Sequence, residues 1–355
     1  MITMEDLLAL LVRKGGSDLH VSTGSPPRLR IDGVLVPVET EPLTPEDTRR
    51  LATSVLTSDQ IAKLDRDMEL DCSFELEGQG RFRANVFYQR GAVATVLRLV
   101  PHELATFDQL GLPRDVCERI CGLRSGLVLV TGATGSGKST SLAAMIDHVN
   151  KTRHGHIVTI EDPIEFAHKS QGCMVTQREV GTDSHKFGNA LRSVLRQDPD
   201  IVLVGELRDH ETIEAALTLA ETGHLTFGTL HTSDAVQTIN RVIDVFPAHA
   251  QQQVRTQLSF VLEAVFCQQL LPAATGRGRV LAAEVMLANA AIRALIREGK
   301  GHQIYSQIQT GGRYGMKTMA GWLADVVRAG KVRVEDAERS MADPSELRML
   351  MRNAA

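Results

Sequence analysis

The stretch Gly126-Leu127-Val128-Leu129-Val130-Thr131-Gly132-Ala133-Thr134-Gly135-Ser136-Gly137-Lys138-Ser139 decides the fold of the larger part of this chain. Its first five residues form a short apolar run, which is typical of a buried parallel strand. Gly132–Ser139 then matches the pattern G-x-x-x-x-G-K-[ST] at every fixed position, and a helical pattern follows it. A strand, a glycine-rich loop and a helix in this order indicate a phosphate-binding loop rather than a chance glycine-rich turn.

This loop contains the groups that bind a nucleoside triphosphate. Glycines let backbone N–H groups surround the phosphates, and the helix N-terminus adds a partial positive charge. We expect Lys138 to contact the β- and γ-phosphates and the Ser139 hydroxyl to bind Mg2+. ATP is favoured over GTP because Asn150-Lys151-Thr152-Arg153 lacks the aspartate of a guanine-reading motif. The predicted nucleotide-binding residues are Gly132, Ala133, Thr134, Gly135, Ser136, Gly137, Lys138, Ser139 and Thr140.

Acidic residues follow two other apolar runs. Ile201–Val204 leads to Glu206, and His156–Ile160 leads to Glu161 and Asp162. In open parallel sheets ligands bind beyond the carboxyl ends of the strands, so Glu206 is expected to face the phosphates. A carboxylate there can orient or deprotonate the attacking water, or hold Mg2+ through its water shell. Glu161 and Asp162 are candidates for binding Mg2+ or polarising water.

Two histidines flank the β-prone segment Leu225–Leu230. His224 and His231 are seven residues apart, and this odd spacing places them on opposite faces of a strand. They are therefore not expected to chelate one metal together. A histidine at a strand end near a γ-phosphate can act as a sensor by hydrogen bonding.

The order of the elements predicts an α/β fold for the second part of the chain. Apolar runs at Gly126–Val130, His156–Ile160 and Ile201–Val204 alternate with helical stretches, as does Leu225–Leu230. This alternation argues for a parallel sheet covered on both faces. The region after Pro272 reads as mostly helical.

The first part of the chain reads as a small α+β domain. It is rich in predicted strands between residues 17 and 99, and Arg98 lies in one of them. Another strand alternates, with Phe82, Ala84 and Val86 on one face and Arg81, Arg83, Asn85 and Phe87 on the other. The pattern breaks at 101–113, which we take as a linker. The predicted domains are residues 1–100 and 114–355, of which 270–355 is mostly helical.

The composition excludes several classes of protein. The 355 residues carry a net charge of −4 and only 4% aromatic residues, which argues against a nucleic-acid-binding surface. No apolar run reaches the ~18–20 residues of a membrane-spanning helix, and the start does not read as a signal peptide, so we expect a cytoplasmic protein. The five cysteines form no C-x-x-C pair and are expected to be buried free thiols.

Together these motifs resemble the secretion ATPase superfamily of type II secretion and type IV pilus systems, and most closely its PilT-type pilus-retraction ATPases. The resemblance covers nearly the whole chain. It implies a PAS-like N-terminal domain joined to a RecA-like ATPase domain, assembled as a ring hexamer. The matching stretches are Ser17–His20, Pro26–Gly33, the Walker A loop Gly132–Ser139, the Asp box Thr159–Glu165, the Walker B stretch Ile201–Asp209 and the His box Thr222–Thr232.

The resemblance also implies catalytic roles. Glu206 corresponds to the general base and Glu161 to an assisting acid, while His231, with His224 second, corresponds to a sensor of the γ-phosphate. Arginines on the N-terminal domain of the family reach a nucleotide when the domains close, and the matching residues are Arg81, Arg83 and Arg98. A guanidinium stabilises charge on the transferring phosphoryl group.

One stretch favours pilus retraction over extension. Ala291–Glu298 reads AIRALIRE and resembles the AIRNLIRE signature of retraction ATPases, with Ala294 in place of the asparagine. On a helix Arg293 and Arg297 lie four residues apart on one face, away from the apolar stripe, and are candidates for coupling hydrolysis to motion. Extension-type relatives usually carry an extra N-terminal domain and a four-cysteine zinc insertion, and from this sequence we expect neither.

The resemblance therefore predicts a hexameric ATP-driven motor that retracts a type IV pilus. Its implied partner is the inner-membrane platform protein of the pilus, at whose base it would dock. The alternatives are a pilus-extension or type II secretion ATPase, a RecA-like nucleic-acid translocase, and a nucleotide-binding regulator without turnover. Physical reasoning alone leaves open the direction of force, the ring symmetry, and the choice between a main and an accessory motor.

Overall fold

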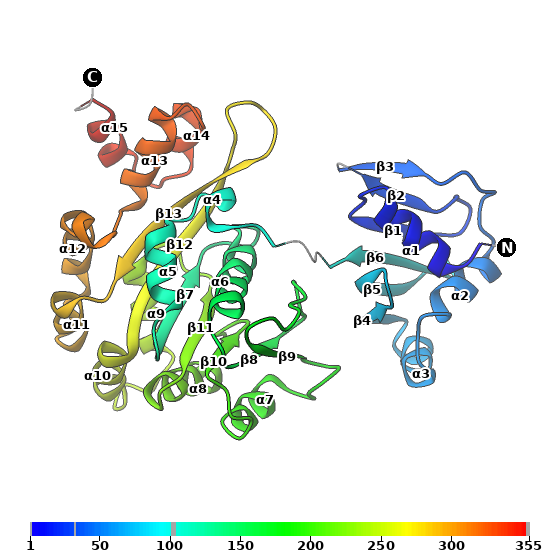
Figure 1. Ribbon diagram of the computed structural model, residues 1–355. Coiled ribbons are helices and arrows are strands. Elements are labelled where there is room, and N and C mark those ends of the chain that lie inside the picture. The colour runs from blue at the N-terminus through cyan, green and yellow to red at the C-terminus, as the bar shows by residue number, and fades with distance from the viewer. Residues whose placement is uncertain (1, 32, 101–103, 353–355) are drawn as a thin grey trace. The chain divides into compact units, whose positions relative to one another are not determined.

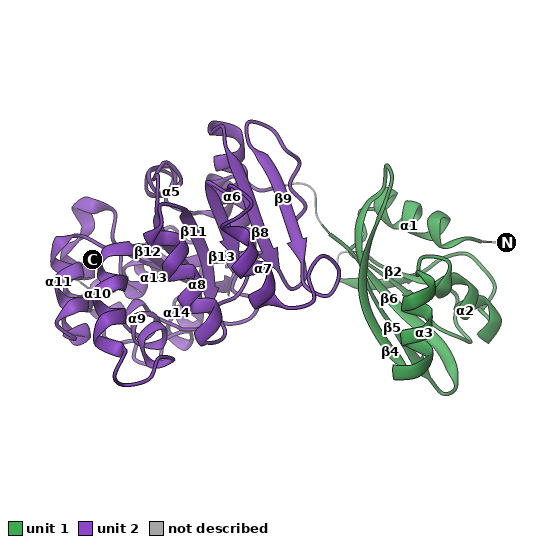
Figure 2. Ribbon diagram, turned by 90° about the horizontal axis from the view of Figure 1, so that it is seen from below, with its two compact units in different colours: residues 1–103 green, residues 104–355 purple. Residues whose placement is uncertain are grey.

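The computed structural model describes residues 2–31, 33–100 and 104–352. The chain divides into two compact units, Met1–Glu103 and Leu104–Ala355, coloured separately in Figure 2. Each unit has its own hydrophobic core, and each is described here by itself.

Unit 1 is an antiparallel sheet with helices packed on one face. Its described residues form six strands in the order β3-β2-β1-β6-β5-β4. Helices α1, α2 and α3 pack on the apolar face of the sheet. The elements are α1 (Met4–Arg13), β1 (Asp18–Val21), β2 (Arg28–Ile31), β3 (Val34–Pro37), α2 (Pro45–Thr53), α3 (Ser58–Asp67), β4 (Glu69–Leu76), β5 (Gly80–Gln89) and β6 (Ala92–Leu99).

The alternation predicted for β5 is confirmed. Phe82, Ala84 and Val86 are at most 2% exposed and belong to the core of unit 1. The residues that alternate with them, Arg81, Arg83 and Asn85, are only partly buried. The opposite face of this sheet therefore carries the arginines.

Unit 2 is built on a sheet whose described strands follow the order β13-β12-β7-β11-β10-β8-β9, as Figure 1 shows. All neighbouring pairs in it are parallel except β12 and β13. The strands are β7 (Gly126–Thr131), β8 (His156–Glu161), β9 (Met174–Glu179), β10 (Ile201–Val204), β11 (Leu225–Leu230), β12 (Leu262–Pro272) and β13 (Arg279–Leu287).

Helices cover both faces of this sheet, as the sequence predicts. Val128 and Val130 of β7 pack against one group of helices, and Leu127 and Leu129 pack against the other. The first group is α5 (Arg114–Cys121), α6 (Lys138–Thr152), α13 (Met319–Arg328), α14 (Val334–Arg339) and α15 (Ser345–Arg352). The second group is α7 (Phe187–Val194), α8 (His210–Glu221), α9 (Ala235–Asp244), α10 (Gln251–Val261), α11 (Ala290–Arg297) and α12 (Ile304–Thr310).

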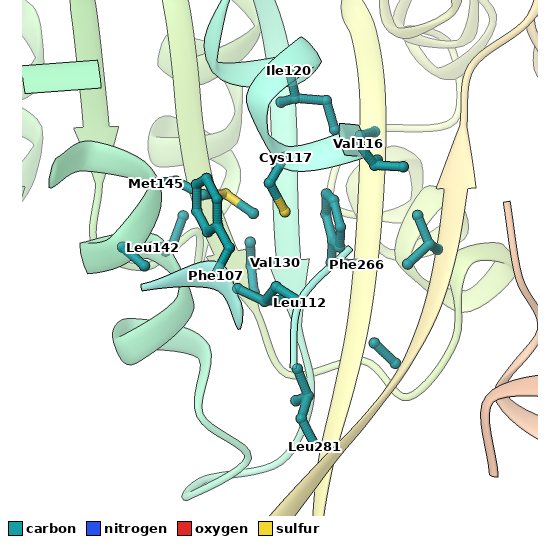
Figure 3. Packing of buried hydrophobic residues seen from close by; sticks show 14 of the residues in the cluster. Phe107, Leu112, Val116, Cys117, Ile120, Val130, Leu142, Met145, Phe266 and Leu281 are labelled. Carbon is teal, nitrogen blue, oxygen red and sulfur yellow. The ribbon is translucent and has the colours of Figure 1, made fainter. Parts of the chain in front are cut away.

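Two boundaries differ from the sequence-based expectation. Residues 101–103 of the expected linker lie outside the described residues, but the rest of it belongs to unit 2. There α4 (Phe107–Leu110) forms, and Phe107 and Leu112 pack with Val130 and Met145, as Figure 3 shows. The stretch 270–355 also contains the nine-residue strand β13, which is stabilised by its antiparallel pairing with β12.

The thiols and the surface fit the expectations from composition. Cys117, Cys121, Cys173 and Cys267 are buried free thiols, and Cys72 is half-buried. Burial raises the pKa of Cys117 to about 12, so this thiol is unreactive at neutral pH. Among the described residues, no helix combines the length and apolar character needed to cross a bilayer.

Candidate active site

The register of the parallel strands brings three functional segments to one edge of the unit 2 sheet. Leu230 at the end of β11 lies opposite Thr131 at the end of β7, and Val204 at the end of β10 lies opposite Gly228. The phosphate-binding loop follows β7, Glu206 follows β10 and His231 follows β11. Residues far apart in the sequence therefore meet at the carboxyl ends of neighbouring strands.

The phosphate-binding loop needs its glycines for two different reasons. Gly132, Gly135 and Gly137 have positive φ angles of 138°, 78° and 90°, which L side chains rarely adopt. A Cβ atom at Gly132 would also collide with the backbone carbonyl of Gln268 and lie 2.6 Å from the Ser136 hydroxyl. Gly137 is the N-cap of α6, so this loop leads directly into a helix N-terminus.

The loop has polar groups that suit phosphate oxygens. The Ser136 Oγ atom is buried and has no hydrogen-bond partner among the described residues. Lys138 Nζ donates to the carbonyls of Gly132 at 2.7 Å and of Ala133 at 3.0 Å. Burial lowers the pKa of Lys138, while the carboxylates of Glu206 and Glu165 act to raise it. A hydroxyl without a partner and an ammonium bound only to carbonyls fit a triphosphate at this position.

Glu206 lies between a cation and a histidine. A guanidinium nitrogen of Arg208 donates to Glu206 Oε2 at 2.8 Å, and His231 Nε2 lies 3.2 Å from Glu206 Oε1. The Arg208 guanidinium holds the pKa of Glu206 below its usual range, although burial acts in the opposite direction. The carboxylate is therefore ionised at neutral pH, and the structure brings two residues that the sequence analysis selected separately, Glu206 and His231, into contact.

The backbone around Glu206 is fixed by the neighbouring strands. Thr229 Oγ1 donates to the Gly205 carbonyl at 2.5 Å, and Leu207 N donates to the Thr229 carbonyl at 2.9 Å. A Cβ atom at Gly205 would lie 3.0 Å from the Ile160 carbonyl, so this close approach favours glycine. Asp209, three residues after Glu206, caps α8 by accepting from Thr212 N at 2.9 Å.

The Asp box places its two glutamates differently. Glu161 is buried and accepts hydrogen bonds from Thr159 Oγ1 at 2.7 Å and Gln177 Nε2 at 3.1 Å, and burial raises its pKa. Glu165, in contrast, is close enough to Lys138 for its charge to act on the pKa of that amine. Sequence reasoning selected Glu161 and missed Glu165, although both lie in the stretch Thr159–Glu165.

His224 does not join this edge within the chain. It precedes β11, whereas His231 follows it, so the two histidines lie at opposite ends of the strand. Its Nδ1 atom lies 3.0 Å from the Leu219 carbonyl and 3.1 Å from Thr222 Oγ1. The structure therefore does not bring His224, the second His-box candidate, to the edge that carries His231, and its ring binds the end of α8.

The three arginines of unit 1 lie together on its exposed sheet face. Arg98 on β6 is the register partner of Arg83 on β5 and of Asp18 on β1. Arg98 Nε donates to Asp18 Oδ1 at 2.8 Å, and its side chain remains 66% exposed. Burial would raise the pKa of Asp18, but hydrogen bonds from Ser17 and Arg98 lower it. Arg81 donates to Ser73 Oγ at 2.7 Å.

The arginine pair of α11 binds the end of α10. Arg293 donates to the carbonyls of Ser259 at 3.0 Å and Phe260 at 2.8 Å, and pairs with Glu263 at 2.7 Å. Arg297 lies 5.9 Å from the centre of the Phe260 ring. A guanidinium at a helix C-terminus stabilises the free carbonyls there, so this pair joins α10 to α11.

Comparison with known proteins places this site in a family. The family described as "Type II/IV secretion system protein" matches residues 2–339. The chain belongs to this family. The resemblance to PilT-type ATPases is also confirmed, because the chain is 48% identical over 339 residues to the "Type IV pilus retractation ATPase PilT" of Pseudomonas aeruginosa, covering 96% of this chain and 98% of that protein.

Two further relatives of this type II/IV secretion system protein are informative. The "Type IV pilus ATPase PilU" of Pseudomonas aeruginosa is 41% identical over 348 residues, covering 98% of this chain and 91% of that protein. The solved structure "Crystal Structure of the Pilus Retraction Motor PilT and Bound ADP" aligns with a TM-score of 0.91 at 49% identity, covering 98% of this chain and 100% of that chain.

Two arginines near the site were missed by sequence reasoning. Arg208 lies in the Walker B stretch and binds Glu206, so its position two residues after the acid was an available signal. Arg279, the first residue of β13, donates to the Gly135 carbonyl of the phosphate-binding loop at 3.4 Å. No local pattern pointed to Arg279, because the contact spans 144 residues.

The collision at Gly132 gives a test of the loop. Gly132→Ala is expected to weaken binding of a fluorescent ADP analogue at least about fivefold, because overpacking here costs about 1–3 kcal/mol and displaces Ser136. Gly276→Ala is the control, since Gly276 also has a positive φ, 75°, but no atom within 4 Å of an added Cβ. Equal ADP affinities for the two variants would contradict this account of the loop.

Proposed function

We propose that this protein is an ATP-hydrolysing motor that powers retraction of a type IV pilus. The observation that supports hydrolysis is the position of Glu206, held by Arg208 and His231 at the sheet edge that carries the phosphate-binding loop. Retraction is supported by the 48% identity to a protein named for it and by the AIRALIRE stretch.

In the proposed reaction Glu206 acts as the general base. Water attacks the γ-phosphorus of ATP, its proton passes to the Glu206 carboxylate, and the bond from the γ-phosphorus to the β–γ bridging oxygen breaks to leave ADP. Lys138 and the N-terminus of α6 stabilise the phosphate charge. The Ser139 hydroxyl would hold Mg2+, which neutralises negative charge on the phosphates when bound.

The ion pair with Arg208 is proposed to restrain this base. A carboxylate bound to a guanidinium has a lowered pKa and is a weaker base than a free one. Movement of Arg208 away from Glu206 would raise the pKa of the carboxyl towards its ordinary value. His231, whose Nε2 lies 3.2 Å from Glu206 Oε1, is then positioned to sense the γ-phosphate by hydrogen bonding and to couple its presence to the same carboxylate.

The Asp box is proposed to assist through both of its glutamates. Glu165, whose charge acts on Lys138, faces the phosphate side and is the better candidate for holding Mg2+ or water. Glu161 supports the box from inside, because it accepts the Glu165 N–H at 3.4 Å as well as bonds from Thr159 and Gln177.

The finer architecture is part of the proposal. Unit 1 is taken as PAS-like and unit 2 as RecA-like, and six chains are taken to form a ring. Arg81, Arg83 and Arg98 would reach a nucleotide when units close on each other, with Asp18 orienting Arg98. A guanidinium delivered in this way stabilises the transition state only when the ring is in the closed arrangement.

The proposed route of force transmission runs from the motor through α10 and α11 to a partner at the membrane. Arg293 and Arg297 hold α11 against the end of α10, so a movement of one helix is transmitted to the other. The proposed partner is the inner-membrane platform protein of the pilus, with the motor docked on its cytoplasmic side.

Replacement of the base is the direct test of hydrolysis. Glu206→Gln should lower ATP turnover at least about hundredfold, because general-base catalysis contributes typically 10²–10⁴-fold. Binding of ADP should stay unchanged, since the loop is intact. Glu214→Gln is the control and should keep full turnover, because the Glu214 side chain on α8 is 63% exposed. Phosphate release by Glu206→Gln at the wild-type rate would contradict the assignment of Glu206 as the general base.

Loss of the gene tests the direction of force. Cells without this protein should carry surface pili but fail to twitch, because extension continues without retraction. A copy carrying Glu206→Gln should not restore twitching. Cells that instead lose their pili would contradict retraction and indicate an extension motor.

A further inference from the structure

A buried carboxyl lies outside the catalytic edge and has no role in the mechanism above. Glu284 on β13 is 2% exposed, and its Oε1 atom accepts a hydrogen bond from the backbone N–H of Ala235 at 2.9 Å. A second backbone hydrogen bond comes from Met319. Burial raises the pKa of Glu284 to about 7, although both backbone bonds act to lower it.

Both donors are the first residues of helices. Ala235 begins α9 and Met319 begins α13, so one side chain binds two helix N-termini. Helix N-termini have unpaired N–H groups and a partial positive charge, which compensate a buried carboxylate. The two helices belong to the clusters on opposite faces of the sheet, and the side chain of Glu284, on the edge strand β13, binds the start of each.

The start of α9 is continuous with the loop that carries His231. Asp234 caps the helix by accepting from Gln237 N at 2.8 Å, and Thr238 Oγ1 donates to the Asp234 carbonyl at 2.7 Å. Thr232 Oγ1 lies 2.7 Å from Thr238 Oγ1. The segment from His231 to Asp234 is thus bonded to the first turn of α9 and moves with it.

We infer that Glu284 is a positioning residue that fixes the His231 loop relative to the C-terminal helices. Through Ala235 it sets where α9 begins, and through that helix it sets the distance from His231 to Glu206. Through Met319 it ties the same loop to α13. The inference rests on the proposed role of His231 and Glu206 in hydrolysis, and it adds a connection from that site to the far part of unit 2.

The groups around Glu284 make its charge sensitive to pH. It faces Asp234 at the start of α9, Cys267 on β12, Tyr305 on α12 and Glu346 on α15. Lys317, beside Val285, is paired with Asp325 and is not directed at it. With a pKa of about 7, Glu284 is protonated below neutral pH and ionised above it. The ionised form binds the two helix N-termini more strongly.

The test compares Glu284→Ala and Glu284→Gln in the full chain, with exposed Glu335→Gln as the control. ATP turnover, KM and binding of a fluorescent ADP analogue are measured from pH 6 to pH 8.5, with melting temperatures to verify folding. Glu284→Ala should lower kcat about tenfold, because it removes the acceptor of two backbone N–H groups, those of Ala235 and Met319. Its ADP affinity should stay within about twofold of wild type, since ADP binds the intact loop.

Glu284→Gln retains an amide oxygen for Ala235 but cannot ionise. The ratio of the wild-type kcat to the kcat of Glu284→Gln should rise about threefold as pH increases through 7. This is the size of effect expected for a charge at a helix N-terminus. The ratio should be near one at pH 6. If Glu284→Ala does not fold, this pH-dependent ratio decides alone.

Two results would overturn the inference. One is a folded Glu284→Ala protein with wild-type kcat, and the other is a ratio of wild type to Glu284→Gln that does not change with pH. Glu206→Gln is measured in parallel. If it loses turnover while Glu284→Ala does not, only the positioning role fails; if it keeps turnover, the proposed hydrolytic site fails.

Discussion

The parallel register of β7, β11 and β10 is the constraint on which the site depends. Because Leu230 lies opposite Thr131 and Val204 opposite Gly228, the three strands end close to the same edge. A shift of one residue in either pairing would move Glu206 and His231 relative to the phosphate-binding loop and turn their strands' side chains to the other face. Buried apolar residues on both faces of these strands hold the register.

The parts of the site that could be predicted from the sequence are those that lie within one short continuous segment. The apolar run before Gly132 and the run Ile201–Val204 each specify a strand, and the residue that follows each strand must lie at its carboxyl end. That rule places Glu206 and His231 at the same edge, and the pairing of β10 with β11 then brings them into contact. The same rule, applied to a residue that precedes a strand, places His224 at the opposite edge.

The remaining features depend on contacts between distant segments. No turn signal in the sequence pairs β12 with β7, yet the carbonyl of Gln268 on β12 is what forbids a side chain at Gly132. Asp18 and Arg98 are 80 residues apart and meet through strand pairing. The helical spacing of Arg293 and Arg297 was readable, whereas their partner, the end of α10, was set by packing.

The central proposal is that ATP is hydrolysed at this strand edge when the chains are assembled in a ring. The most direct measurement is ATP turnover in fractions whose native mass is determined at the same time. The account predicts that turnover appears in hexameric fractions and is absent from monomeric ones. Full turnover in a monomer, or a hexamer without turnover in the presence of Mg2+ and ATP, would contradict it.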